Sequence, residues 1–338
     1  MNKDWAEQLQ GETVLVTGGT GFTGQHLIRT LCAAGAQVRA IARPSSNREA
    51  LAELPIEWFV GEVDDPDLIA RAMDGVSIVF HMATLYRTGD ATEADHYRVH
   101  VTSTERLAQA ALNQPGFKRF VLVSTVGVHG HIEQPPADES APIQPGDEYQ
   151  RTKAQAEQWL NDFAPAQNLP YTIIRPAAIY GPGDQRLLKV FRMARHRWAP
   201  ILGKRPCLYH LIHVQDLVAL LLQVAVDERA EGETFIVGNP EPIPLDQMLE
   251  LIGQSLGRAP RILRLPIAPF WWLAIVCETI CPKIGIAPPL YRRRIKFFLN
   301  DRSFDTRKIR EVLDFAYAFT NETGLIATAR WYRENGLL

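Results

Sequence analysis

A tyrosine and a lysine four residues apart are the clearest candidates for chemistry in this sequence. Tyr149 and Lys153 begin a stretch whose later alanines and leucine indicate a helix, so both side chains lie on one face, one turn apart. A tyrosine hydroxyl ordinarily ionises at about pH 10, and one that works as an acid or base near neutral pH needs a nearby cation. The pair predicts proton transfer at a substrate oxygen, with Lys153 as the cation. A chance pair on a helix surface is the alternative.

A glycine-rich stretch near the N-terminus is the second candidate site. An apolar run at 14–16 leads through Thr17 into a turn with spaced glycines, and an amphipathic pattern follows from residue 26. In such a strand, turn and helix, glycines turn the chain, admit a pyrophosphate to backbone N–H groups and let the helix pack closely. The helix N-terminus then faces the anion. A flexible turn is the alternative. The residues assigned to a dinucleotide here are Gly18, Thr20, Gly21, Phe22, Thr23 and Gly24.

Alternating apolar runs and helical patterns define the elements that position these residues. Strands alternating with helices imply βαβ units and a parallel sheet covered on both faces. Near-continuous apolar strands suit such a sheet. We therefore expect an α/β fold, a Rossmann-type doubly wound parallel sheet with a smaller C-terminal substrate-binding domain. The predicted strands are Thr13–Thr17, Gln37–Ala42, Ile56–Val60, Val76–Met82, Lys118–Thr125 and Tyr171–Arg175.

Composition narrows the class of protein. The chain of 338 residues is 46% hydrophobic and can bury a large core. A net charge of −2 gives no basic footprint, so we expect no nucleic-acid partner. The four cysteines form no Cys-x-x-Cys pair, and the first ten residues lack an apolar signal core, so we expect a cytoplasmic protein. Cys277 and Cys281 have no histidine or acid placed to complete a metal site, so we expect no metal.

The residue after the second predicted strand bears on the choice of dinucleotide. An acidic residue about 20 positions beyond the glycines holds the ribose 2′-hydroxyl of NAD, whereas an arginine there suits the 2′-phosphate of NADP. Arg43 occupies this place and no carboxylate does. We therefore predict NADP(H), with Ser45, Ser46 and Arg39 as lesser candidates. NAD stays open, because a solvated surface arginine is the alternative interpretation of Arg43.

Five motifs in order resemble the extended short-chain dehydrogenase/reductase superfamily, in its NAD-dependent epimerase/dehydratase branch. They span residues 13–216, and the resemblance is looser beyond them. The motifs are Thr-Gly-x-x-Gly-x-x-Gly at 17–24, the strand ending Ser124-Thr125 with Val128-His129-Gly130, Tyr149-x-x-x-Lys153, Arg175-Pro176 through Gly183-Asp184, and Ile212-His213-Val214-x-Asp216.

The resemblance implies the roles of individual residues. Tyr149 is the general acid/base, and Lys153 also binds the nicotinamide ribose. The register of the second motif places the catalytic hydroxyl on Thr125, with Ser124 as the neighbouring candidate. Asp64 and Asp65 equally suit helix N-caps before a proline. The further residues that the resemblance assigns to the cofactor are Val63, Asp64, Met82, Ala83, Thr84, Ser124, Pro176 and Ala177.

Departures from the family pattern bear on the mechanism and the substrate. His100 and Ser103 stand where the family has Asn and Gly, which puts in doubt any relay or helix contact made by that asparagine. His129 replaces a tyrosine and is either a pocket residue or polar surface. Tyr209 stands where sugar-nucleotide epimerases place a diphosphate-binding arginine. A diphosphate-linked substrate is therefore disfavoured. We assign residues 12–181 and 210–238 to the NAD(P)-binding domain, and 182–209 and 239–338 to the substrate-binding domain.

An uncharged stretch at 265–277 stands out in the C-terminal third. It is shorter than the roughly 20 residues of a spanning helix. Trp271 and Trp272 lie in it, with arginines on both sides. These features suit an apolar pocket, peripheral membrane contact through residues 265–296, or a core helix of the smaller domain.

The sequence thus predicts an enzyme with a small-molecule substrate, and three functions stay open. The first is an NADP(H)-dependent oxidoreductase acting on an apolar ketone or secondary alcohol. The C-terminal third of the chain resembles 3β-hydroxysteroid dehydrogenases and dihydroflavonol reductases, and this resemblance implies such a substrate. The second is an NDP-sugar epimerase or dehydratase with bound NAD. The third is a catalytically silent scaffold, against which the intact Thr125, Tyr149 and Lys153 argue. By analogy with relatives, we expect a homodimer formed through helices at 92–112 and 149–163.

Overall fold

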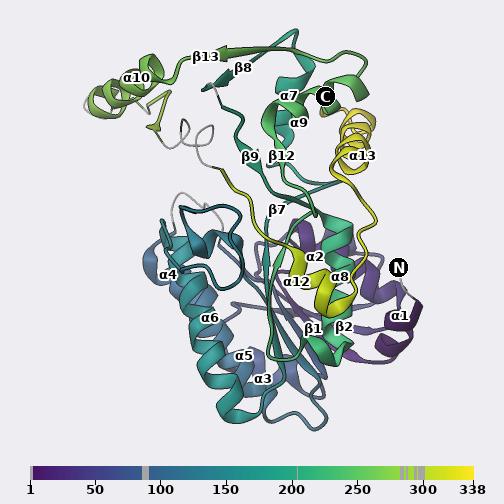
Figure 1. Cartoon of the computed structure of the whole chain (residues 1–338). Coiled ribbons are helices and arrows are strands. Elements are labelled where there is room, and N and C mark those ends of the chain that lie inside the picture. Colours follow the sequence, from purple (N-terminus) through teal and green to yellow (C-terminus); the bar gives the residue numbers. More distant parts are fainter. Residues whose placement is uncertain are drawn as a thin grey trace.

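A seven-stranded sheet forms the centre of the computed structural model (Figure 1), which describes residues 3–85, 91–203, 205–281, 285–286, 288–292, 295 and 301–338. Every pairing in the sheet is parallel, and the strand order is β11-β6-β5-β4-β1-β2-β3. The predicted α/β class and doubly wound sheet are therefore confirmed. Its strands are β1 (Thr13–Thr17), β2 (Gln37–Ala42), β3 (Ile56–Val60), β4 (Ile78–His81), β5 (Arg119–Val123), β6 (Tyr171–Pro176) and β11 (Thr234–Val237).

The predicted strands match the observed ones closely in the first half of the sheet. The bounds of β1, β2 and β3 agree with the prediction residue for residue. Strand β4 begins two residues later than predicted, because the Val76 N–H closes a turn onto the Met73 carbonyl. It ends one residue earlier, because the Met82 N–H donates to the side chain of Thr17. Apolar pattern alone does not distinguish these turn residues from strand residues.

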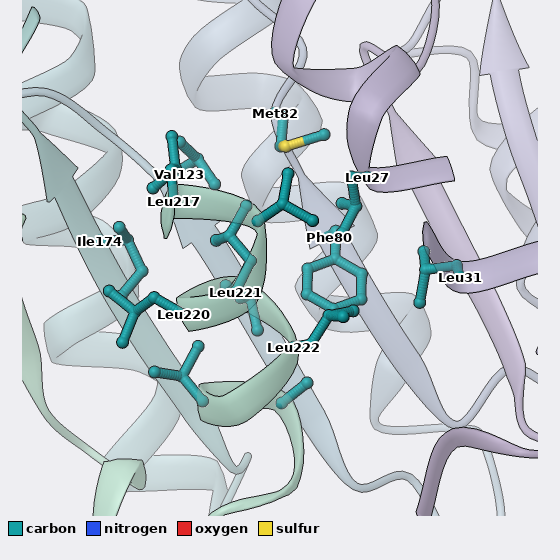
Figure 2. Close-up of a cluster of buried hydrophobic side chains, with 14 of the residues drawn as sticks. Leu27, Leu31, Phe80, Met82, Val123, Ile174, Leu217, Leu220, Leu221 and Leu222 are labelled. Atoms are coloured by element: carbon teal, nitrogen blue, oxygen red, sulfur yellow. The ribbon is translucent and has the colours of Figure 1, made fainter. Parts of the chain in front are cut away.

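Helices cover both faces of the sheet, and each face has its own core. One face is covered by α1 (Lys3–Leu9), α2 (Phe22–Ala33), α8 (Val214–Val226) and α12 (Arg307–Leu313), whose apolar side chains pack on Phe80, Val123 and Ile174 (Figure 2). The other face is covered by α3 (Pro66–Met73), α5 (Ser103–Ala111) and α6 (Glu148–Gln167). Helix α1 has no counterpart in the prediction, and its Leu9 is fully buried.

The predicted helix at 92–112 consists of three segments. They are α4 (Glu93–Tyr97), a single π-helical turn, η2 (Arg98–Thr102), and α5. Single π turns inside α-helices commonly mark functional positions. His100 lies in the middle of this one.

A second lobe packs beyond the carboxyl ends of the strands. Its core includes Phe191, Leu249, Leu325 and Tyr332. The division into two domains at the predicted boundaries stays a prediction. Helix α12, within the range assigned to the smaller domain, packs on the central sheet through Ile309 and Leu313. The remaining elements are β7 (Ala178–Tyr180), α7 (Leu188–Arg195), β8 (Trp198–Leu202), β9 (Leu208–Tyr209), β10 (Leu211–His213), β12 (Ile243–Pro244), α9 (Leu245–Ser255), β13 (Arg261–Leu265), α10 (Ile267–Ile280) and α13 (Asn321–Glu334), with 3-10 turns at Glu49–Leu51, Val126–His129 (η3) and Glu228–Ala230.

The strand order reverses direction between β1 and β4. In open parallel sheets, ligands bind at the carboxyl ends of the strands, beside such a reversal. The turn after β1, the loop after β4 and the end of β5 therefore meet at one edge of the sheet. Both candidate sites of the sequence lie there.

Candidate active site

Lys153 is anchored at the carboxyl end of β5. It is 2% exposed, and its Nζ donates to the Val123 carbonyl at 3.0 Å. Burial lowers the pKa of Lys153 to about 8, and the charge of Glu157 opposes this shift. Tyr149, one turn earlier on α6, is half-buried. Helix α6 begins after Asp147, whose side chain accepts from the Gln150 N–H at 3.0 Å, so the cap fixes the turn that carries Tyr149.

The two candidate hydroxyls after β5 have different surroundings. Thr125 begins the turn η3, and its Oγ1 accepts from the Gly127 N–H at 3.0 Å. That bond leaves the hydroxyl proton of Thr125 able to donate to another oxygen. Within the described residues, the Ser124 Oγ is buried without a hydrogen-bond partner. A buried polar atom of this kind calls for a ligand or water.

The glycine-rich turn is built by close contacts that only glycine allows. Gly18 has a φ of +72°, and a Cβ there would lie 2.7 Å from the Met82 carbonyl oxygen. A Cβ on Gly24 would lie 2.3 Å from the Gly18 carbonyl oxygen. Gly21 instead is the N-cap of α2, with no side-chain cap. The N–H groups of the first turn of α2 therefore suit a pyrophosphate.

The loop after β4 packs on this turn through Thr17. The Thr17 Oγ1 accepts from the N–H groups of Met82 and Ala83, at 3.1 Å each. Its own proton is thus left for the His81 Nδ1, at 2.7 Å. The His81 Nε2 in turn donates to Ser103 Oγ at 3.0 Å. His81 is therefore a neutral, buried ring that holds the loop at 82–84 against the glycines.

His100 joins the same loop to the helix that carries Tyr149. Its Nε2 accepts from the Leu85 N–H at 3.2 Å and lies 3.0 Å from the Thr84 Oγ1. Because Nε2 accepts, the proton is on Nδ1, which donates to the Thr152 Oγ1 at 2.7 Å. The His100 ring also meets the Tyr149 ring edge-on, with centroids 5.5 Å apart. The histidine that departs from the family pattern thus makes a helix contact of its own.

A buried ion pair lies one turn beyond Lys153 on α6. The Arg175 Nη2 lies 2.6 Å from the Glu157 Oε2, and both side chains are less than 10% exposed. Arg175 also donates to the His129 Nε2 and to the Glu139 carbonyl, at 3.2 Å each. His129 is therefore buried in this network and is not polar surface. Sequence reasoning did not single out Glu157, although its spacing of four from Lys153 places it on the same helix face.

Two residues that the resemblance assigns to the cofactor, Val63 and Asp64, follow β3. Both are buried. The Asp64 carboxylate accepts from the Arg98 Nε at 2.9 Å, and this bond holds its pKa below the usual range. Asp65 is the N-cap of α3, accepting from the Asp67 N–H at 2.9 Å. The helix-cap alternative thus holds for Asp65, whereas Asp64 is held by an ion pair.

Two arginines are candidates for binding the 2′-phosphate of the cofactor. One already binds other protein groups, and the other is exposed. Arg39, a lesser candidate, binds Glu57 at 2.8 Å and the carbonyls of Ala72 and Asp74, so it is committed elsewhere. Arg43 is exposed directly after β2, the strand next to β1. Its role at the cofactor phosphate stays a prediction.

The last cofactor residues follow β6. Pro176 and Ala177 are buried at its carboxyl end, and the Ala177 N–H donates to Val237 at 2.8 Å. A Cβ on Gly183 would lie 3.6 Å from the ring of Phe22, at the start of α2. A hollow at this point is lined by Phe22, Gln25, His26, Gly183, Asp184, Gln185 and Arg186. The open N-terminus of α2 and the buried, unpartnered Ser124 hydroxyl are features that fit a dinucleotide.

The free energy of unfolding is expected to fall as the pH drops below about 6.5. Burial, with the charge of Lys153, lowers the pKa of His81 to about 3 and of His100 to about 2. The unfolded chain binds both protons between these values and about pH 6.5, whereas the folded chain does not. The free energy of unfolding therefore has its full value above about pH 6.5. It decreases as the pH falls, by up to about 1.4 kcal/mol for each ring and each pH unit.

Urea unfolding of the wild type and of His100→Asn between pH 7 and pH 5 measures this slope at about one pH unit intervals. In His100→Asn the unfolding free energy is expected to fall less steeply with decreasing pH, because one of the two titrating rings is absent. His131→Asn, at an exposed position, is the matched control. An equal slope in wild type and His100→Asn would contradict the assignment of His100 as a neutral buried ring.

The fold and the site define a dinucleotide-dependent enzyme, and comparison with known proteins identifies its family. The sequence profile of the NAD-dependent epimerase/dehydratase family matches residues 14–238. The chain belongs to this family, within the extended short-chain dehydrogenases/reductases, and is an NAD(P)-dependent enzyme.

Individual relatives match almost the whole chain. Sterol demethylase protein B of Methylococcus capsulatus is 30% identical over 335 residues, covering 96% of this chain and 100% of that protein. A 3 beta-hydroxysteroid dehydrogenase/Delta 5-->4-isomerase of Mycobacterium tuberculosis is 28% identical, covering 94% of this chain and 90% of that protein. The crystal structure of UDP-glucose 4-epimerase from Thermotoga maritima shares the fold, with a TM-score of 0.76 at 23% identity, over 96% of this chain and 99% of that one.

Proposed function

We propose that this enzyme transfers hydride between NADP(H) and an apolar ketone or secondary alcohol, of steroid- or flavonoid-like character. The bound nicotinamide supplies or accepts the hydride. Tyr149 protonates the carbonyl oxygen in the reducing direction, and Thr125 donates a hydrogen bond to that oxygen. Lys153 stabilises the phenolate that Tyr149 leaves behind. Oxidation of an alcohol follows the same path in reverse.

The observation that carries the proposal is the anchoring of Lys153 beside the strand reversal. Its ammonium is held by the Val123 carbonyl at the carboxyl end of β5, two residues before Thr125. The turn of α6 that bears Tyr149 is fixed by the Asp147 cap and by the His100 contact. The acid/base group, its cation and the second hydroxyl therefore belong to adjoining elements at the edge where a dinucleotide binds.

Two observations support an apolar substrate. Tyr209, in place of a diphosphate-binding arginine, is buried in β9. Relatives that match almost the whole chain carry names that refer to sterols or hydroxysteroids. A steroid-like ring system offers one or two oxygens on a large apolar surface, so the pocket that accepts it needs few charges.

Purified protein is expected to oxidise NADPH in the presence of at least one apolar cyclic ketone, because Tyr149 can protonate the oxygen of any carbonyl held beside the nicotinamide. The nicotinamide absorbance of NADPH is measured with each member of a panel of steroid and flavonoid ketones. UDP- and dTDP-sugars form the second arm of the experiment. Sugar interconversion by protein that retains NAD, with no net NADPH loss, would instead support the epimerase or dehydratase alternative. Turnover in neither arm would contradict the proposal.

Arg43→Ala is expected to weaken NADPH binding about tenfold or more while leaving NADH binding nearly unchanged. A guanidinium that binds the 2′-phosphate makes a charge-assisted hydrogen bond, and NADH lacks this group. Fluorescence titration with both cofactors measures the two dissociation constants. Arg48→Ala, an arginine nearby in the sequence whose guanidinium lies 5.8 Å from the Trp58 ring, is the control. Equal losses for both cofactors would refute the role of Arg43.

A further inference from the structure

Helix α10 lies at the far end of the second lobe (Figure 1) and carries almost no polar side chain. Only Ala274 of its 14 residues is buried. Its inner side, with Phe270 and Trp271, packs against Leu202 and Ile295. Before Glu278 and Thr279 in its last turn, the helix is apolar around its circumference, a pattern that ordinarily belongs to a fully buried helix or to one in contact with lipid.

The outer side of α10 is a continuous apolar surface. Trp272 is 67% exposed, Leu273 52%, Val276 48% and Ile280 51%. These positions follow the spacing of three or four that places side chains on one helix face. Single exposed apolar residues are ordinary in proteins, but a contiguous patch marks a binding surface.

The sequence that contains and flanks this helix has a net charge opposite in sign to that of the rest of the chain. The sequence between 261 and 296 contains seven Lys or Arg and one acid, Glu278, a net charge of +6. The whole chain carries −2, so the remainder carries −8. Some of these basic residues, at 283, 293, 294 and 296, lie outside the described residues, and the count uses the sequence alone. A cationic apolar segment on an acidic protein is the pattern of a surface that meets anionic lipid headgroups.

We propose that α10 docks this enzyme on anionic membranes, lying in the interface with Trp272, Leu273, Val276 and Ile280 inserted. The helix has 14 residues, so it is too short to cross a bilayer. No helix among the described residues is both long and apolar enough for that. A second copy of the chain is disfavoured as the occupant, because a symmetric contact through α10 would bring two strongly cationic segments together. This proposal is independent of the substrate.

Vesicle flotation of the full-length protein tests the proposal. We expect binding to phosphatidylcholine vesicles containing phosphatidylglycerol, and several-fold weaker binding to phosphatidylcholine alone or at high salt. Trp272→Glu/Val276→Glu is expected to lower partitioning at least about tenfold, since it removes two inserted apolar side chains. Both positions are exposed, so the fold is expected to be retained, and a circular-dichroism melt checks this. Val60→Glu, at an exposed apolar position on the far edge strand β3, is the matched control.

Three results would overturn the proposal. The wild type could fail to float with anionic vesicles, or a folded Trp272→Glu/Val276→Glu variant could float as well as the wild type. The third is self-association without lipid, seen by analytical ultracentrifugation, that the double substitution abolishes while vesicles bind neither protein. That result would make a second copy the occupant of α10.

Discussion

Replacing Tyr149 with phenylalanine is expected to lower kcat about 10³-fold, the scale of a lost general acid/base. The substitution removes one hydroxyl and keeps the ring, whose edge-on contact with His100 is thereby retained. Lys153 stays anchored on the Val123 carbonyl, because that bond does not involve the tyrosine. The loss therefore concerns proton transfer and not the shape of the site. Steady-state turnover with NADPH and the ketone found in the panel measures it.

Binding of the cofactor separates this effect from damage to the fold. Fluorescence titration of Tyr149→Phe with NADPH is expected to give a Kd within about threefold of the wild type, since the glycine turn and Lys153 are intact. Tyr97→Phe, on the exposed surface of α4, serves as the control and is expected to keep full turnover. Wild-type kcat in Tyr149→Phe would remove Tyr149 from the mechanism.

The parts of this site that could be predicted from the sequence are those encoded by local spacing. The glycine turn, the Tyr149 and Lys153 pair and the strand ending at Thr125 each depend on residues close together in the chain. The sheet then aligns them, because the carboxyl ends of parallel strands share one edge. Predicting six strands in order was therefore sufficient to expect the two candidate sites near each other.

The contacts that hold the site in place could not be predicted in this way. The bond from His100 to Thr152 joins residues 52 apart in sequence, and the Arg175–Glu157 pair depends on how α6 lies against β6. A substitution such as His100 for asparagine shows only that the family's contact is changed. Which new partner the side chain meets depends on the packing of three elements, and no periodicity encodes that.

Glu157→Gln is expected to destabilise the fold by about 3 kcal/mol, because it leaves the Arg175 guanidinium buried without its counter-charge. Both side chains of the pair are less than 10% exposed, so water does not replace the lost partner. Glu57→Gln, in the more exposed pair with Arg39, is the matched control and is expected to change stability by about 0.5 kcal/mol or less. Urea unfolding at pH 7 compares the two. Equal effects would show that the buried pair carries no special stabilisation.

A second measurement on Glu157→Gln distinguishes an effect on the site from an effect on the fold. The charge of Glu157 raises the pKa of Lys153, against the burial that lowers it to about 8. Without that charge the pKa of Lys153 falls further, so the ammonium is lost at a lower pH and Tyr149 loses its cation there. The alkaline limb of the kcat profile is therefore expected to move toward lower pH in Glu157→Gln and to stay in place in Glu57→Gln. A variant that is destabilised but keeps the wild-type limb would limit Glu157 to a structural role.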